Sequence, residues 1–339
     1  MLDNKLNRRS FIKGSIVSSG VALGLSFEER HLLAAMTKKT DGSDRAAEEK
    51  PASGRNALPS GKIARLKISR LFCGGNLIGG WAHSRDLTYA SDLVKAYHTD
   101  RKIFETLELA EDCGINTVLT NPRSDEVINK YWKERGGQIQ WISDCASGDN
   151  IKEGIKRSID SGAHALYVQG GIADKAVQNG KVDQIAEALE YIKQSKLPGG
   201  IGAHCLETIK ACVNAGLKPD FWVKTLHPDN YWSATPKEYR KPFDVVDPYS
   251  PDHNRFHDNM WCTNPQETIE YMKTINEPWI AFKVMAAGAI SPHDGFKFAF
   301  EGGADFVCAG MFDFQVREDV IIARDILAAK PNRQRPWRS

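Results

Sequence analysis

The sequence lacks a strong excess of charge of either sign. Its 45 Lys and Arg residues and 43 Asp and Glu residues give a formal net charge of +2, and the basic residues are scattered along the chain. Proteins that bind nucleic acid concentrate positive charge in a patch or stripe. Nucleic acid is therefore not an expected partner of this chain.

The sequence also lacks paired cysteines and long hydrophobic runs. Its seven cysteines are odd in number and fall mostly inside expected strands and helices, unlike the cysteines of a disulfide scaffold. Buried free thiols are the expected state. Near the N-terminus an apolar stretch from Ile16 to Phe27 is broken by Gly20 and Gly24. It falls short of the roughly 20 apolar residues that a membrane-spanning helix needs.

The first 36 residues have the pattern of an export signal. The run from Asn7 to Lys13 contains an Arg-Arg pair followed by Ser-Phe-Ile and resembles the twin-arginine motif of bacterial signal peptides. The alternative is a disordered basic tail with a chance Arg-Arg pair. No small-x-small cleavage site follows Phe27. We expect delivery to the periplasm by the twin-arginine translocase, with the signal either cleaved or retained as a membrane anchor.

Three further segments follow the signal. Residues 37–62 are polar and charged with almost no large apolar side chain, which is the composition of a flexible linker. Residues 63–331 are close to the ~250 residues typical of an α/β barrel and are enough for one large core. Residues 332–339 remain as a C-terminal tail.

Short apolar and β-branched runs alternate with amphipathic stretches from Ser69 onward, which is typical of parallel βα units. In one such stretch Ile151, Ile155 and Ile159 share a helix face. An open, doubly wound sheet is the alternative, but no Gly-rich dinucleotide fingerprint follows the first expected strand. We therefore expect a closed (βα)8 TIM barrel. Its eight strands are expected at residues 70–76, 116–120, 139–144, 165–169, 200–204, 221–226, 279–285 and 305–309.

The loop after the sixth strand, residues 228–265, is far longer than usual, and loops beyond about 15 residues are usually functional or disordered. It mixes aromatic residues with polar ones, and flat rings beside hydroxyl-binding groups suit a sugar-like ligand. We expect an ordered lid over a small, polar, carbohydrate-type substrate. The residues expected to bind substrate, from strand ends and lid, are Asn76, Asn121, Gln169, Trp232, His257, Asp258 and Trp261.

Chemistry in a barrel belongs at the carboxyl ends of the strands. The residues there with acid–base or nucleophilic side chains suit lyase or isomerase chemistry. A lysine in an apolar barrel beside a second cation has a lowered pKa and becomes nucleophilic, although a lysine can also simply neutralise a carboxylate or a bound anion. The expected catalytic residues are Asp144, His204, Lys224, His227 and Lys283.

Two histidines on neighbouring strands suggest a metal. His204 ends strand five and His227 follows strand six, so both can point into the mouth at the carboxyl end of the barrel. With Asp313, or alternatively Asp144, they can hold a divalent metal that keeps an open coordination position. The alternative is that these side chains only hydrogen-bond within the mouth. The sequence names no cofactor, and a divalent metal is possible.

Both ends of the expected barrel resemble the aldo-keto reductase family. Residues 68–71 with Gly74 and Gly75 resemble that family's first strand, residues 109–116 its approach to strand two, and residues 310–320 the stretch after strand eight. The resemblance implies a (βα)8 barrel and an NADP-dependent oxidoreductase, with NADP a weaker cofactor candidate than a divalent metal.

The catalytic set of that family is not matched. Leu119-Thr120-Asn121 stands where the family has Asp-Thr-Ala after strand two. Ser143-Asp144 stands where the family has the lysine that closes strand three, and Gln169-Gly170 where it has the histidine that closes strand four. The tyrosine after strand two is also missing, so ordinary carbonyl reduction lacks its proton donor. An oxidoreductase with a rebuilt site and a non-catalytic exported binding barrel stay open as alternatives.

Overall fold

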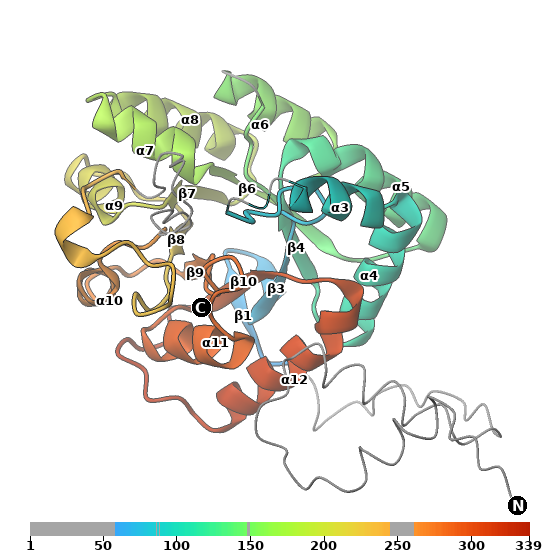
Figure 1. Cartoon of the computed structure of the whole chain (residues 1–339). Helices are drawn as coiled ribbons and strands as arrows, with labels where there is room; N and C mark the ends of the chain where they lie inside the picture. The colour runs from blue at the N-terminus through green and yellow to red at the C-terminus, as the bar shows by residue number, and fades with distance from the viewer. Residues whose placement is uncertain (1–57, 86, 88, 148–149, 245–260) are drawn as a thin grey trace, which may run out of the picture. The chain divides into compact units, whose positions relative to one another are not determined.

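Eight parallel strands close into a barrel in a computed structural model that describes residues 58–85, 87, 89–147, 150–244 and 261–339 (Figure 1). Each strand pairs with its neighbours in chain order, and the last pairs with the first. The expected TIM barrel is therefore confirmed. The barrel strands are β3 (Leu71–Gly74), β4 (Thr117–Thr120), β5 (Gln140–Ser143), β6 (Ala165–Val168), β7 (Gly199–Ala203), β8 (Phe221–Thr225), β9 (Trp279–Phe282) and β10 (Phe306–Gly310).

Helices surround the barrel on its outer face (Figure 1). Among the described residues, no helix is long and apolar enough to cross a membrane. The α-helices are α3 (Ala90–Tyr97), α4 (Asp100–Asp112), α5 (Asp125–Arg135), α6 (Ile151–Asp160), α7 (Gly170–Gln178), α8 (Val182–Gln194), α9 (Leu206–Asn214), α10 (Pro265–Met272), α11 (Pro292–Glu301) and α12 (Asp313–Ala328), and two 3₁₀ turns are η1 (Pro122–Ser124) and η2 (Lys237–Tyr239).

The alternation of side chains along each strand separates two cores. In β8, Phe221 and Val223 belong to the apolar cluster that fills the barrel, whereas Trp222 belongs to the cluster between the strands and the helices. This two-residue period is the geometry of a strand with both faces covered. Phe72 and Ile142 complete layers of the inner cluster, so the barrel is packed and not a pore.

A hairpin closes the amino-terminal end of the barrel. Strands β1 (Ser60–Ile63) and β2 (Leu66–Ser69) pair antiparallel, and their buried Ile63 and Ile68 join the inner cluster. The linker expected over residues 37–62 therefore ends in an ordered strand, because its last residues pair with the strand that follows. Residues 37–57 and the expected signal lie outside the described residues.

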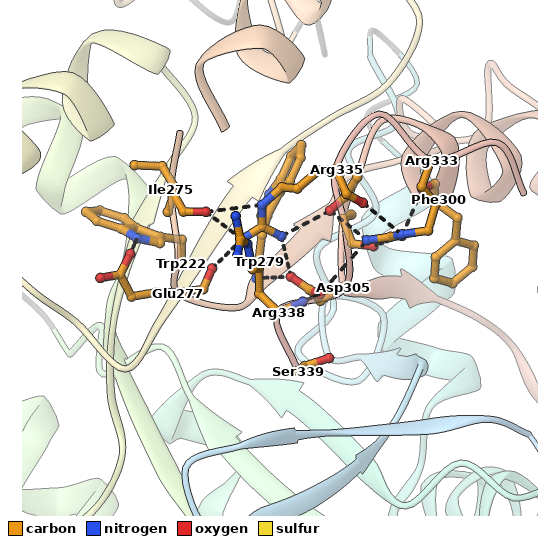
Figure 2. A network of polar contacts seen from close by, with 12 residues as sticks. Trp222, Ile275, Glu277, Trp279, Phe300, Asp305, Arg333, Arg335, Arg338 and Ser339 are labelled. Atoms are coloured by element: carbon orange, nitrogen blue, oxygen red, sulfur yellow. Dashed lines mark hydrogen bonds and ion pairs between the residues drawn. The ribbon is translucent and has the colours of Figure 1, made fainter. Parts of the chain in front are cut away.

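The C-terminal residues, expected as a tail, pack against the same end of the barrel. Figure 2 shows Asp305, which precedes β10, at the centre of their contacts. Arg335 donates to the Asp305 carboxylate over 2.6 Å, and both side chains are 0 % exposed. The same carboxylate accepts from the backbone N–H of Trp279 (3.0 Å) and of Arg338 (2.7 Å). Every group in this buried ion pair thus has a partner.

Candidate active site

Lys283 lies at the opposite, carboxyl end of the barrel, directly after β9. The expected strand 279–285 ends at Phe282 because Lys283 has φ 56°, in the left-handed region that non-glycine residues rarely adopt. The half-buried side chain places Nζ 3.1 Å from His83 Nε2 and 3.7 Å from the centroid of the Trp261 ring. Burial lowers the pKa of Lys283 to about 7, so much of the amine is neutral near neutral pH.

His83 reaches this amine from the loop after β3. Its backbone has φ 48°, a second strained position at the mouth. Burial, with smaller contributions from Lys283 and His204, lowers the pKa of His83 to about 3, so the imidazole is neutral. A neutral imidazole beside a partly neutral amine can exchange a proton with it.

His204 and Asp174 form a hydrogen-bonded pair on the neighbouring wall. His204 follows β7, and its Nδ1 lies 2.9 Å from the Asp174 carboxylate of α7. That carboxylate also accepts from the His204 backbone N–H (3.0 Å) and from the Thr208 hydroxyl (2.6 Å). Because the Asp174 oxygens accept from these N–H and O–H groups, we assign the imidazole proton to Nδ1 and the lone pair to Nε2. Nε2 makes no hydrogen bond to any described residue, and burial lowers the pKa of His204.

Trp261 joins these groups into one cluster. Its ring centroid is 5.2 Å from that of His83 and 5.2 Å from that of His204, and the Lys283 amine lies over its face. We call His83, Asp174, His204, Trp261 and Lys283 the amine cluster.

Asp144 lies elsewhere at the mouth, after β5. Its carboxylate accepts from the Asn121 side chain and from the Ala146 N–H, each over 2.9 Å. Burial raises the pKa of Asp144 to about 6 although both hydrogen bonds oppose the shift. Tyr167 of β6 is buried near Asp144, and burial raises its pKa further above its ordinary range, so it remains a neutral hydroxyl. An acid with a raised pKa and an amine with a lowered one are typical of acid–base sites.

Two of the expected catalytic residues are fully buried, and other groups of the fold engage their side chains. Lys224 alternates with the inward Val223 and therefore points out of the barrel, where its Nζ donates to the Thr225 carbonyl (2.9 Å) and hydroxyl (2.8 Å). His227 is fully buried, and both of its ring nitrogens are engaged, Nδ1 with the Pro228 carbonyl and Nε2 with a backbone N–H. Neither side chain is available to a substrate.

The structure does not assemble the expected metal site. Asp313 begins α12 and binds Lys102 of α4 over 3.0 Å, and the ring nitrogens of His227 are occupied. In the described part of the chain no three His, Cys, Asp or Glu side chains are grouped to hold a metal ion. His204 is thus the one member of the expected trio that belongs to the amine cluster.

Only some of the residues expected to bind substrate lie at the mouth. Asn121 and Trp261 are at the mouth as described above, and Asn76 is exposed at the end of β3. Gln169 instead accepts from the Ile172 N–H and starts α7, and Trp232 is 75 % exposed. His257 and Asp258, with lid residues 245–260, lie outside the described residues.

Sequence reasoning missed His83 and Asp174. His83 stands in a loop without any motif around it. Asp174 had a usable signal, because a charged residue on the apolar face of α7, shared with Gly170, Ala173 and Ala176, has to find a buried partner.

Comparisons with known proteins support the fold alone. No family model and no curated protein matches the chain. A solved structure from Pseudomonas aeruginosa, of a protein whose name assigns it provisionally to the aldo-keto reductases, is 17 % identical with a TM-score of 0.53 and aligns over 80 % of this chain and 98 % of its own. A second structure of that name and organism is 16 % identical with the same TM-score of 0.53 and the same coverage, 80 % and 98 %. The chain is thus similar in fold to aldo-keto reductase-like TIM barrels.

Proposed function

We propose that this chain is a barrel enzyme that acts on the carbonyl group of a small, polar, carbohydrate-type substrate by lyase or isomerase chemistry. One observation carries the proposal: the half-buried amine of Lys283 lies at the carboxyl end of a barrel strand, 3.1 Å from the neutral imidazole of His83. Barrel enzymes place their reacting groups at that end. An amine that is neutral near pH 7 is a nucleophile toward carbonyl carbon.

The proposed reaction begins with attack of the neutral Lys283 amine on the carbonyl carbon. A C–N bond forms, and the oxygen takes up one proton from the attacking nitrogen and one from solvent. The C–O bond then breaks, water leaves, and an iminium ion remains. The iminium ion withdraws electrons from the adjacent carbon, so a C–H bond there can break and its proton can pass to His204 Nε2. Asp174 stabilises the imidazolium that results, as the carboxylate partner of a catalytic histidine does.

The surroundings of the amine favour a hydroxylated substrate. The face of Trp261 can stack on the apolar face of a sugar, and Asn121 with Asp144 can bind hydroxyl groups at the same mouth. Asp144 has a pKa of about 6 and is protonated part of the time, so it can also donate a proton to a departing oxygen.

Borohydride trapping tests the proposal. The protein is incubated with a panel of small aldoses, ketoses and 2-keto acids, reduced, and digested for mass spectrometry. We expect a reduced adduct on Lys283 with at least one compound, and none at this position in Lys283→Met. Lys297→Arg, which alters an exposed lysine of α11, is the matched control and should leave the adduct unchanged. No adduct on Lys283 and no turnover across the panel would refute the proposal.

We also propose that the twin-arginine translocase exports the protein to the periplasm. The run from Asn7 to Lys13 supports this proposal, as do seven cysteines that are all free thiols, which suits folding in a reducing compartment before transport. Substituting Arg8 and Arg9 together by Lys should retain the protein in the cytoplasm in fractionation experiments. Unchanged periplasmic recovery of that variant would contradict twin-arginine export.

A further inference from the structure

Strained backbone is concentrated beside the Lys283 amine. Ten described non-glycine residues have positive φ, and five of them lie in two segments that touch. His83 and Arg85, at 48° and 58°, are in the loop after β3, whereas Lys283, Ala286 and Ala287, at 56°, 44° and 54°, follow β9. Such conformations persist only where the surroundings hold them, and they gather at functional sites.

Arg85 holds the two segments together. Its Nη2 donates to the Ala286 carbonyl over 3.0 Å, and its Nη1 lies 3.5 Å from the Ala287 carbonyl. Its Nε donates to the Ser233 hydroxyl over 3.0 Å, and its guanidinium lies 4.9 Å from the centroid of the Trp232 ring. One side chain thus connects the loops that follow β3, β8 and β9.

These three loops hold three of the five members of the amine cluster. The loop after β3 carries His83, the loop after β8 leads to Trp261, and the loop after β9 begins with Lys283. A guanidinium is suited to this role because its donors point in fixed, separate directions, whereas a lysine ammonium is a single point of attachment.

We propose that Arg85 is a positioning residue, whose guanidinium clamps the loop after β3 to the loop after β9 and to Ser233, so that His83 closes over the Lys283 amine and excludes water from it. Its importance for turnover rests on the function proposed above, but its effect on the amine does not.

Burial, more than charge, governs the state of this amine. The titratable groups that face it are His83 from the loop after β3, His204 after β7, His227 after β8 and Cys308 of β10. Burial lowers the pKa of each of these histidines and raises that of the Cys308 thiol to about 12, so all four are neutral near pH 7. Opening the clamp admits water and should therefore make the amine harder to deprotonate.

Competitive labelling with acetic anhydride across a pH series tests the clamp on the full chain. The reagent modifies only neutral amines, and mass spectrometry of the Lys283 peptide gives the pH at half-maximal rate. We expect this midpoint near pH 7 in the native protein and at least one pH unit higher in Arg85→Ala. Arg85→Lys should move it in the same direction. Arg101→Ala removes an arginine whose side chain is 77 % exposed and should leave the midpoint unchanged.

Identical midpoints in the native protein and Arg85→Ala would overturn the proposal, as would a native midpoint near the ordinary value for lysine. If Arg85→Ala does not fold, Ser233→Ala decides, because it removes one acceptor of the clamp and leaves Arg85 in place. We expect a smaller upward shift in that variant, and no shift would overturn the proposal. Labelling needs no substrate, so failure of carbonyl trapping would refute the proposed function and leave this result standing.

Discussion

The two ends of the barrel differ in how many hydrogen-bond partners surround their buried charged groups. At the amino-terminal end, Asp305 and Arg335 are completely buried, yet each has several hydrogen-bond partners besides the other (Figure 2). At the carboxyl end, the Lys283 amine has a single hydrogen-bonded neighbour among the described residues, and burial shifts its pKa strongly. A charge that is fully paired contributes to a fixed structure, whereas one left underpaired near neutral pH can change its protonation state during a reaction.

The largest expected effect is on stability at the amino-terminal end. Asp305→Ala should lower the free energy of unfolding by about 3–5 kcal/mol, because it leaves the Arg335 guanidinium buried without a countercharge. Urea denaturation at pH 7 measures the effect. Lys156→Ala, which breaks an exposed ion pair with Asp160 on α6, is the control and should leave the free energy of unfolding nearly unchanged. Equal effects of the two variants would contradict the contrast between buried and exposed pairs.

At the carboxyl end of the barrel, the largest expected effect is on the rate of the proposed reaction and not on stability. Asp174→Asn should slow proton transfer at the carbon beside the carbonyl by about 10²-fold, because an amide can donate to Nδ1 and stabilise the wrong tautomer of His204. Deuterium exchange from solvent into a compound that forms the Lys283 adduct measures the rate. Adduct formation itself should persist. An unchanged exchange rate would remove His204 from the role of base.

Lys283→Met should raise the free energy of unfolding by about 1 kcal/mol or more at pH 6, because it removes a buried amine that is charged at this pH. The sign follows from linkage: the folded-state pKa of about 7 is below the ordinary lysine value of 10.5, so the unfolded chain binds more protons between these values. The native protein should therefore gain stability as the pH rises from 7 to 10, and its difference from the variant should shrink. Parallel stability profiles of the two proteins would contradict the lowered pKa.

The smallest expected effect concerns Asp144. Its folded-state pKa of about 6 lies above the ordinary value of 3.8, so this group favours folding most below pH 3.8, and that contribution is lost as the pH rises through 6. In Asp144→Asn this part of the pH dependence should be absent, a difference of about 1 kcal/mol or less after allowance for water at the mouth. Thermal denaturation between pH 4 and 7 resolves it, and an unchanged profile would argue against a raised pKa.

The sequence was a better guide to strands than to which side chains face the mouth. Lys224 and Lys283 both stand at ends of expected strands, but Phe221 and Val223 face inward, so the two-residue period turns Lys224 outward. That period was readable in the sequence. The engagement of both nitrogens of His227 was not, because one partner, the backbone N–H of Cys262, is distant along the chain.

The sequence by itself determined the (βα)8 barrel and its order of strands, because the alternation of apolar strands and amphipathic helices is a local pattern that recurs along the chain. It also placed Asp144, His204 and Lys283 at strand ends. Only the tertiary structure decided which groups meet: His83 reaches Lys283 across 200 residues, and Asp174 reaches His204 across 30. Such contacts depend on the closure of the barrel and on loop conformations that no local pattern encodes.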